Sequence, residues 1–347
     1  MSADAPDLFE QQEINRKHSR WLIASFVWFF AWLGFGGDFI LREATRGGRF
    51  GGYHYFFPWL TVAMVLVGVA VALYAWYTGA RKVLWATRAW RLVEPHDASE
   101  KQLLDVVEEM VIAAGIERPQ VYLVEDDDPN AFATGRDESD ARVVVTRGML
   151  RVCTRDELQA VVAHEMGHIK NLDVRLMTLL TALIGAVALM SDGVTQIVFG
   201  FGLRGDDSEK EGEGIAVRAL LLIFFPVWIL TWLLGPLVTR LITLAVSRDR
   251  ELLADAMSAQ FTRNPMALAT ALDKIEACEA PTTSLRASVA HLCICDPLGR
   301  SVNDRRGFLA DLAATHPPME ERVGALKAMA YGGAEASGAV AAPPAAG

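Results

Sequence analysis

The sequence has few charged residues and few cysteines, and each shortage narrows the class of protein. Charged residues make up 22% of the 347 residues, whereas 52% are apolar and the mean hydropathy is +0.23. This composition excludes disorder over most of the chain, and the positive hydropathy indicates a protein of a lipid bilayer. The length allows one or two domains with an ample core.

The cysteines follow neither a disulfide framework nor a paired zinc-knuckle spacing. They are Cys153, Cys278, Cys293 and Cys295. A single C-x-C pair at 293–295 is a weak signal for redox chemistry or metal binding. We therefore expect ordinary reduced thiols in a reducing compartment, and the role of that pair stays open.

A basic excess is missing as well. The 33 Lys and Arg residues are outnumbered by 42 Asp and Glu, which gives a net charge of −9. Residues 94–140 hold 14 acidic residues and only three basic ones. A chain with this excess of negative charge does not favour binding to the phosphate backbone of nucleic acids, so we expect no nucleic-acid partner.

Long apolar runs are present and predict membrane spans at residues 21–37, 51–80, 176–191 and 219–239. The second and fourth easily cross a hydrocarbon core of about 30 Å, whereas the first and third are short, and the third could be partly re-entrant. The first run could also be a cleaved signal peptide. Its 20-residue leader is long for that purpose and a second span follows at once, so we expect a retained anchor.

Basic residues near the spans orient the chain. Seven of them precede the first span or follow the second, against three in the loop between these spans. The positive-inside rule then places both termini and the polar middle in the cytoplasm. We expect a multi-pass protein of a cell inner membrane, with membrane lipid as a partner and the active site facing the cytoplasm.

Between and after the spans the sequence reads as globular. Ser99-x-x-Gln102 predicts the start of a helix that Gly115 ends, and Thr154-x-x-Glu157 predicts the cap of another. Short strands are expected at residues 121–124 and 142–146, and helices at residues 247–261 and 267–280.

The sharpest motif is His164-Glu-Met-Gly-His168. Histidines at i and i+4 share one helix face, so both imidazoles can reach a single Zn²⁺. Glu165 lies beside them, where it can take a proton from the attacking water. The alternative is a pair of helix histidines packed without a metal.

A catalytic zinc ion needs a third protein ligand. Glu251 and Asp255 are also four residues apart, so one can bind the metal while the other holds a ligand histidine by its second ring nitrogen. The alternative is a solvated helix end, because residues 248–250 form a charge run. Together with the His-Glu-x-x-His motif upstream, the ligand interpretation is favoured.

Four motifs occur in order: residues 129–135 (PNAFATG), 164–168 (HEMGH), 247–251 (SRDRE) with Asp255, and 315–322 (THPPMEER). Over roughly residues 97–327, the chain resembles the HtpX-type integral-membrane zinc metalloproteases, in the wider family that includes the CAAX prenyl endopeptidases. Two departures matter. Residues before about 94 match only in having two spans, and residues 291–298 carry Cys293 and Cys295, so substrate identity is not carried over.

The resemblance implies one zinc ion per chain, bound by His164, His168 and Glu251. Glu165 would be the base, and Asp255 would support a metal ligand without binding the metal itself. It also implies an edge strand that pairs with extended substrate, formed by Asn130, Ala131, Phe132, Ala133 and Thr134. His316 and Arg322 resemble a late His-Pro…Arg pair of that family. His316 is thus a candidate catalytic donor to the oxyanion, or else a capping histidine, and Arg322 is a candidate substrate-binding residue.

We therefore expect a mostly helical α+β fold, with a membrane-anchored zincin-like protease domain, a small β-sheet and about four transmembrane helices. By number, the expected parts are a cytoplasmic N-terminal segment (1–20), two transmembrane helices (21–80), a first protease part with the zinc-binding helix (81–173), two transmembrane or partly re-entrant helices (174–246), a second protease part with the third zinc ligand (247–331) and a disordered tail (332–347).

The expected function is zinc-dependent hydrolysis of internal peptide bonds in protein or peptide substrates, and the resemblance implies quality control of misfolded or damaged membrane proteins. One alternative is a catalytically silent membrane adaptor, which the intact Glu165 disfavours. Charged neighbours of the motif disfavour an intramembrane protease. A metal transporter would need polar ligands within the spans. The sequence specifies neither the substrates nor the oligomeric state.

Overall fold

The computed structural model describes residues 8–46, 57–183, 248–278, 282, 284, 285, 289, 292–295 and 317–338. The chain divides into two compact units. The first comprises Met1–Arg16, Ala80–Thr178 and Ile242–Gly347, and the second comprises Lys17–Gly79 and Leu179–Leu241.

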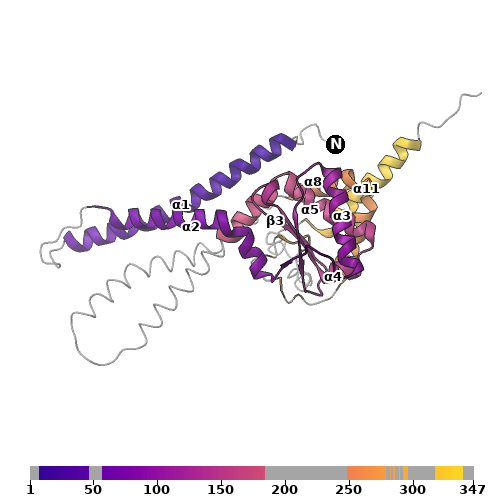
Figure 1. Cartoon of the computed structure of the whole chain (residues 1–347). Coiled ribbons are helices and arrows are strands. Elements are labelled where there is room, and N and C mark those ends of the chain that lie inside the picture. The colour runs from indigo at the N-terminus through magenta and orange to yellow at the C-terminus, as the bar shows by residue number, and fades with distance from the viewer. Residues whose placement is uncertain are drawn as a thin grey trace, which may run out of the picture. The chain divides into compact units, whose positions relative to one another are not determined.

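Two long apolar helices dominate the beginning of the chain, α1 (Leu8–Arg46) and α2 (Trp59–Ala86) (Figure 1). Among the described residues, the stretches long and apolar enough to cross a membrane are Glu10–Phe39 and Trp59–Ala86. Many large apolar side chains on them are exposed, for example Trp21 at 73% and Leu66 at 65%. Exposed apolar surface of this kind suits contact with lipid.

Helix α1 extends beyond the expected first span, residues 21–37, at both ends. The N-terminal segment and the first span form one uninterrupted helix, which passes Gly37 and ends at Arg46. Gly34 lies where a Cβ would clash with the Thr61 backbone, so this glycine serves the close packing of α1 against α2 rather than a break in the helix. The third predicted span is helical to residue 183, and the rest of it and the fourth span lie outside the described residues.

Among the described residues, four short strands form the sheet of the first unit in the order β1-β2-β4-β3. They are β1 (Trp90–Arg91), β2 (Gln120–Val124), β3 (Ala131–Thr134) and β4 (Arg142–Thr146). β2 and β4 are parallel, with Val121 opposite Val143, whereas β1 and β3 pair antiparallel at the two edges. The strands predicted at 121–124 and 142–146 are confirmed. β1 was not predicted, since two residues carry no periodicity.

Helices complete this unit: α3 (Ala98–Ala114), α4 (Arg147–Val152), α5 (Arg155–Lys170), α8 (Arg248–Thr262), α9 (Pro265–Ala277) and α11 (Met319–Gly338), with a short 3₁₀ helix at Glu138–Asp140. α5 is the central helix and packs against α3, α8, α9 and β3 (Figure 1). Its apolar residues, among them Leu158, Val162 and Met166, are almost fully buried in the core. The helix that carries the two histidines is therefore held on several sides.

The helix ends confirm two of the predicted signals and contradict a third. The capping box of Thr154 and Glu157 at the start of α5 is confirmed. The cap predicted at Ser99 is wrong, because Asp97 accepts the amide of Glu100 and the Glu100 carboxylate reaches back to the His96 amide. Gly115 ends α3 in the left-handed conformation, with φ of 65°, as predicted.

The C-terminal helix is longer than expected. α11 continues to Gly338, so the disordered tail does not begin at residue 332. Residues 332–338 contain three glycines and two alanines, and only the alanines have a high helix propensity. The helix predicted at 267–280 instead begins at Pro265 after the Asn264 cap and ends at Ala277.

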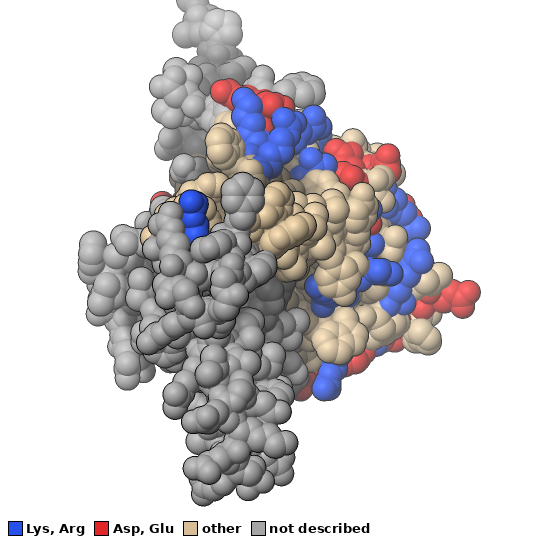
Figure 2. Space-filling view, turned by 90° about the vertical axis from the view of Figure 1, so that its left-hand side faces the viewer, with Lys and Arg blue, Asp and Glu red and all other residues tan. Residues whose placement is uncertain are grey.

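Charges on the described surface are mixed in sign. Figure 2 shows basic and acidic side chains interspersed over the described part of one face. Arg147 illustrates the pairing, since its guanidinium contacts the carboxylates of Asp97, Glu100 and Glu125. Burial alone would raise the pKa of Glu100, but hydrogen bonds from the His96 backbone and from Arg147 lower it.

Candidate metal and peptidase site

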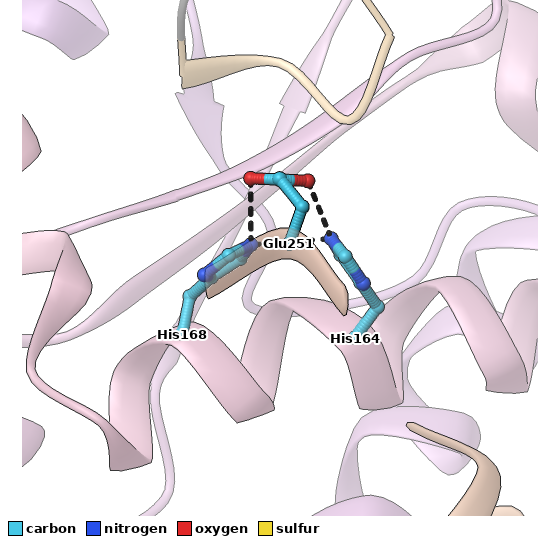
Figure 3. Close-up of side chains that lie close together, drawn as sticks. All are labelled: His164, His168 and Glu251. Carbon is cyan, nitrogen blue, oxygen red and sulfur yellow. Dashed lines mark hydrogen bonds and ion pairs between the residues drawn. The ribbon is translucent and has the colours of Figure 1, made fainter. Parts of the chain in front are cut away.

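α5 presents His164 and His168 on one side, as the four-residue spacing predicts. Their rings lie 4.7 Å apart between centroids and meet edge to face, and their Nε2 atoms are 3.1 Å apart. Both imidazoles point toward one carboxylate (Figure 3). The His164 side chain is 1% exposed and the His168 side chain 16% exposed, so the pair lies at the inner end of a nearly closed site.

Glu251 of α8 supplies that carboxylate. Its Oε2 lies 3.7 Å from His164 Nε2 and its Oε1 lies 3.5 Å from His168 Nε2. A tetrahedral zinc ion with bonds of about 2.1 Å would hold its ligand atoms about 3.4 Å apart. The observed separations of 3.1, 3.5 and 3.7 Å bracket that value, so this donor set fits a small divalent ion.

His164 is held from behind by the second predicted carboxylate. Its Nδ1 lies 2.9 Å from Asp255 Oδ1, and Asp255 in turn receives two hydrogen bonds from Arg322, of 2.7 and 2.9 Å. Burial alone would raise the pKa of Asp255, but the charge and hydrogen bonds of Arg322 lower it to about 2. Asp255 is therefore a permanent anion that fixes the orientation of the imidazole.

His168 has a comparable support that the sequence analysis missed. Its Nδ1 lies 3.1 Å from Asp173 Oδ2. Burial alone would lower the pKa of His168, but Asp173 and Glu251 raise it to about 9. A proton on this imidazole has to leave when a metal ion binds, because the metal takes the same nitrogen lone pair. An acidic residue five positions after the second histidine was the available signal.

Glu165 lies beside the ligands. Its side chain is buried, and it lines a cavity of about 30 Å³, which is large enough for one water molecule. Burial raises the pKa of Glu165 to about 7, although a backbone hydrogen bond from Ala133 lowers it in part. A divalent cation on the neighbouring ligands would lower this pKa further and leave Glu165 ready to accept a proton.

The predicted substrate strand is an edge strand in the sheet. β3 pairs with β4 on one side only, but its residues are nearly inaccessible, Ala133 at 5% being the most exposed. Residues 292–295 lie along it: the Ile294 amide donates to the Ala131 carbonyl over 2.9 Å, and Asn130 Nδ2 donates to the Cys295 carbonyl over 2.8 Å. Pairing of a substrate with β3 stays a prediction, and it requires this segment to make room.

The remaining predicted residues divide into two groups. Arg322 is fully buried, and its guanidinium contacts Asp255 and the Ile294 carbonyl, so the structure places it beside the predicted metal ligands. A role in substrate binding stays a prediction. His316 lies outside the described residues.

The four cysteines form no disulfide, and burial raises the pKa of the Cys153 thiol to about 12.

The model of peptidase family M48 matches residues 97–330, a stretch that contains every residue of this site. The chain belongs to peptidase family M48. The resemblance predicted from the four motifs is confirmed.

Three relatives of this M48 chain show how far the similarity extends. A protease HtpX homologue from Tropheryma whipplei (strain TW08/27) is 38% identical over 317 residues, which are 91% of this chain and 97% of that protein. Homologues from Thermoanaerobacter pseudethanolicus and Streptococcus gordonii are 36% and 33% identical and cover 79% and 93% of this chain, and 87% and 100% of their own lengths. Family and relatives together support a metalloprotease.

Among solved structures, the crystal structure of S. mikatae Ste24p matches 76% of this chain and 57% of that one, at 16% identity and a TM-score of 0.42. This likeness is too distant to support an argument.

Proposed function

We propose that this M48 protein is a membrane-bound, zinc-dependent endopeptidase. The observation that carries the proposal is the buried cluster of His164, His168 and Glu251, with Glu165 at its edge. Two imidazoles and one carboxylate are a donor set of catalytic zinc sites, in which a fourth position stays open for water or substrate. We infer one zinc ion per chain.

Each residue of the site then has a chemical role. Zinc bound to the three ligands would polarise the scissile carbonyl and lower the pKa of the attacking water. Glu165 accepts a proton from that water and delivers it to the leaving amine. Asp255 and Asp173 keep the ligand imidazoles in place while this proton moves.

The proposed substrates are extended segments of protein chains. β3 ends the sheet next to Glu165, and an edge strand recognises extended peptide through main-chain hydrogen bonds. Such segments occur in unfolded or damaged proteins, which supports a role in the quality control of membrane proteins. The cytoplasmic orientation rests on the basic residues that flank the first two spans.

Cleavage of an unfolded protein tests the proposal. Full-length protein purified in detergent would be incubated with casein as wild type, as Glu165→Gln and as the control Asp156→Asn, which changes an exposed carboxylate on the same helix. We expect chelator to abolish cleavage by the wild type and the control, zinc to restore it, and the Glu165→Gln variant to bind zinc but lose at least about a thousandfold in rate.

The opposite result is equally clear. If wild type bound zinc and cut nothing, the silent adaptor would replace the protease in this account. Cleavage that persisted in Glu165→Gln would remove Glu165 from the mechanism.

A further inference from the structure

The N-terminal part of α1 belongs to the same unit as α5 and contacts the last residue of α5 and the turn after it. Gln12 Nε2 donates to the Lys170 carbonyl over 2.7 Å, and Asn15 Nδ2 donates to the Asn171 carbonyl over 2.8 Å. Asn15 is 0% exposed, although it lies 156 residues away from Asn171 in the chain. A polar side chain buried at such a contact is specific, because its hydrogen bonds must be matched.

The contacted turn has an unusual backbone. Leu172 adopts φ of 61°, a left-handed conformation that a branched apolar residue rarely takes. Asn15 bonds both sides of it: the carbonyl of Asn171 before it and, over 2.8 Å, Oδ1 of Asp173 after it. One amide group with two donors therefore fixes the turn from both ends.

The same turn orients a predicted metal ligand. Asp173 uses Oδ1 for Asn15 and Oδ2 for Nδ1 of His168, which lies 3.1 Å away. Another cation near Asp173 is Arg250, whose Nε is 3.9 Å from Oδ1, too far for a hydrogen bond. These contacts thus run from the Asn15 amide through one carboxylate to the imidazole.

We propose that Asn15 is a positioning residue for the zinc site and acts on His168 through Asp173. The inference rests on the proposed function, since it takes His168 as a zinc ligand. A neutral amide donor fixes the direction of the carboxylate without cancelling its charge, so Asp173 stays a strong acceptor for the imidazole N–H. A residue near the beginning of α1 thereby sets how well the protease unit holds its metal.

Zinc affinity is the readout, measured by chelator competition on full-length protein in detergent and independent of peptide cleavage. We expect Asn15→Ala to weaken zinc binding by about tenfold, the low end of the range for residues that support metal ligands. Gln12→Ala is the matched control: it removes a hydrogen bond one turn earlier on the same helix but touches neither Asp173 nor His168, so its affinity should equal that of wild type.

Two further measurements separate positioning from docking. The visible absorption spectrum of the Co²⁺-loaded protein reports ligand geometry, and it should change in Asn15→Ala and not in Gln12→Ala. In an Asp173→Ala background, Asn15→Ala should cause no additional loss of zinc affinity, since the connecting carboxylate is already gone.

The outcomes are distinguishable. Equal affinities and spectra for Asn15→Ala and Gln12→Ala, or an undiminished effect of Asn15→Ala in the Asp173→Ala background, would overturn the inference and leave the proposed protease intact. If His168→Ala instead bound zinc as tightly as wild type, the proposed zinc site itself would be wrong.

Discussion

The two histidines of α5 are supported in different ways. His164 is backed by Asp255, whose charge is met by the guanidinium of Arg322, and all three side chains are at most 1% exposed. His168 is more exposed, and its carboxylate partner Asp173 accepts a hydrogen bond from a neutral amide. One support is an ion pair in the core, and the other is a hydrogen bond to the beginning of the chain.

This difference assigns different tasks to the two sides. A buried ion pair stabilises little compared with apolar packing, but breaking it leaves a bare charge in the core. Changes on the His164 side should therefore affect folding first. Changes on the His168 side disturb only the longer ion pair of Asp173 with Arg250, at 3.9 Å, so they should mainly affect the metal.

The largest effect is expected from Asp255→Ala. The substitution leaves Arg322 buried without its main partner, which costs about 3–5 kcal/mol. The apparent unfolding temperature of metal-free protein in detergent should fall by about 10 °C. Asp173→Ala, measured alongside, should lower it by only a few degrees, and an equal fall would contradict the comparison.

A double substitution should recover part of this loss. The double variant Asp255→Asn, Arg322→Met contains no unpaired buried charge at these two positions. Its loss in free energy of unfolding should therefore be about 2 kcal/mol smaller than the sum of the losses of the two single variants. Unfolding of all four proteins completes the cycle. Strict additivity would show that the ion pair does not couple the two residues. The same cycle for Asn15 and Asp173 should be closer to additive in stability.

Asp173→Asn should act mainly on the metal. The amide keeps the shape of the carboxylate but removes its charge, so we expect zinc affinity to fall by about 10–100-fold with little change in unfolding temperature. Chelator competition measures the first quantity and thermal unfolding the second. A variant that bound zinc like wild type would show that Asp173 does not support His168.

The smallest expected effect is on the pH dependence of stability, through Glu157 at the start of α5. Because α5 carries both histidines, this effect should not distinguish between them. Burial alone would raise the pKa of Glu157, but hydrogen bonds from Lys274 and the Thr154 backbone lower it. A carboxyl group with a lowered folded-state pKa stabilises the fold above its unfolded value of about 4.3, and this stabilisation is lost as the pH falls through the folded-state pKa.

Between about pH 5 and pH 3, the unfolding temperature of wild type should therefore fall by more than that of Glu157→Gln, which lacks this carboxyl group. The exposed Asp156→Asn serves as the control and should follow the wild-type curve. Parallel curves for wild type and Glu157→Gln would show that Glu157 contributes no pH-dependent stability.

The sequence predicted the parts of this site that local spacing determines. His164 with His168, and Glu251 with Asp255, are pairs at i and i+4, and helix geometry alone places each pair on one face. The supports Asp173 and Asn15 were not predicted, because they depend on a left-handed turn at Leu172 and on a contact between segments 158 residues apart. No periodicity in either segment announces such a contact.

The fold shows the same division. Strands of five residues and a helix with a Thr154–Glu157 box carry enough local signal to be located. The two-residue β1, the Asp97 cap and the end of α11 do not. At the helix start Ser99 competes with Asp97 for the cap, and only the completed hydrogen bonds decide between them. The strand β1 is too short to carry a periodicity.

X-ray absorption at the zinc edge would identify the atoms that bind the metal ion. For full-length protein loaded with one equivalent of zinc, we expect nitrogen and oxygen neighbours at about 2.0–2.1 Å, with the more distant scattering of two imidazoles. Loss of one imidazole in His168→Ala would agree with this site. Sulfur neighbours at about 2.3 Å, or a spectrum unchanged in that variant, would place the metal elsewhere and contradict the account.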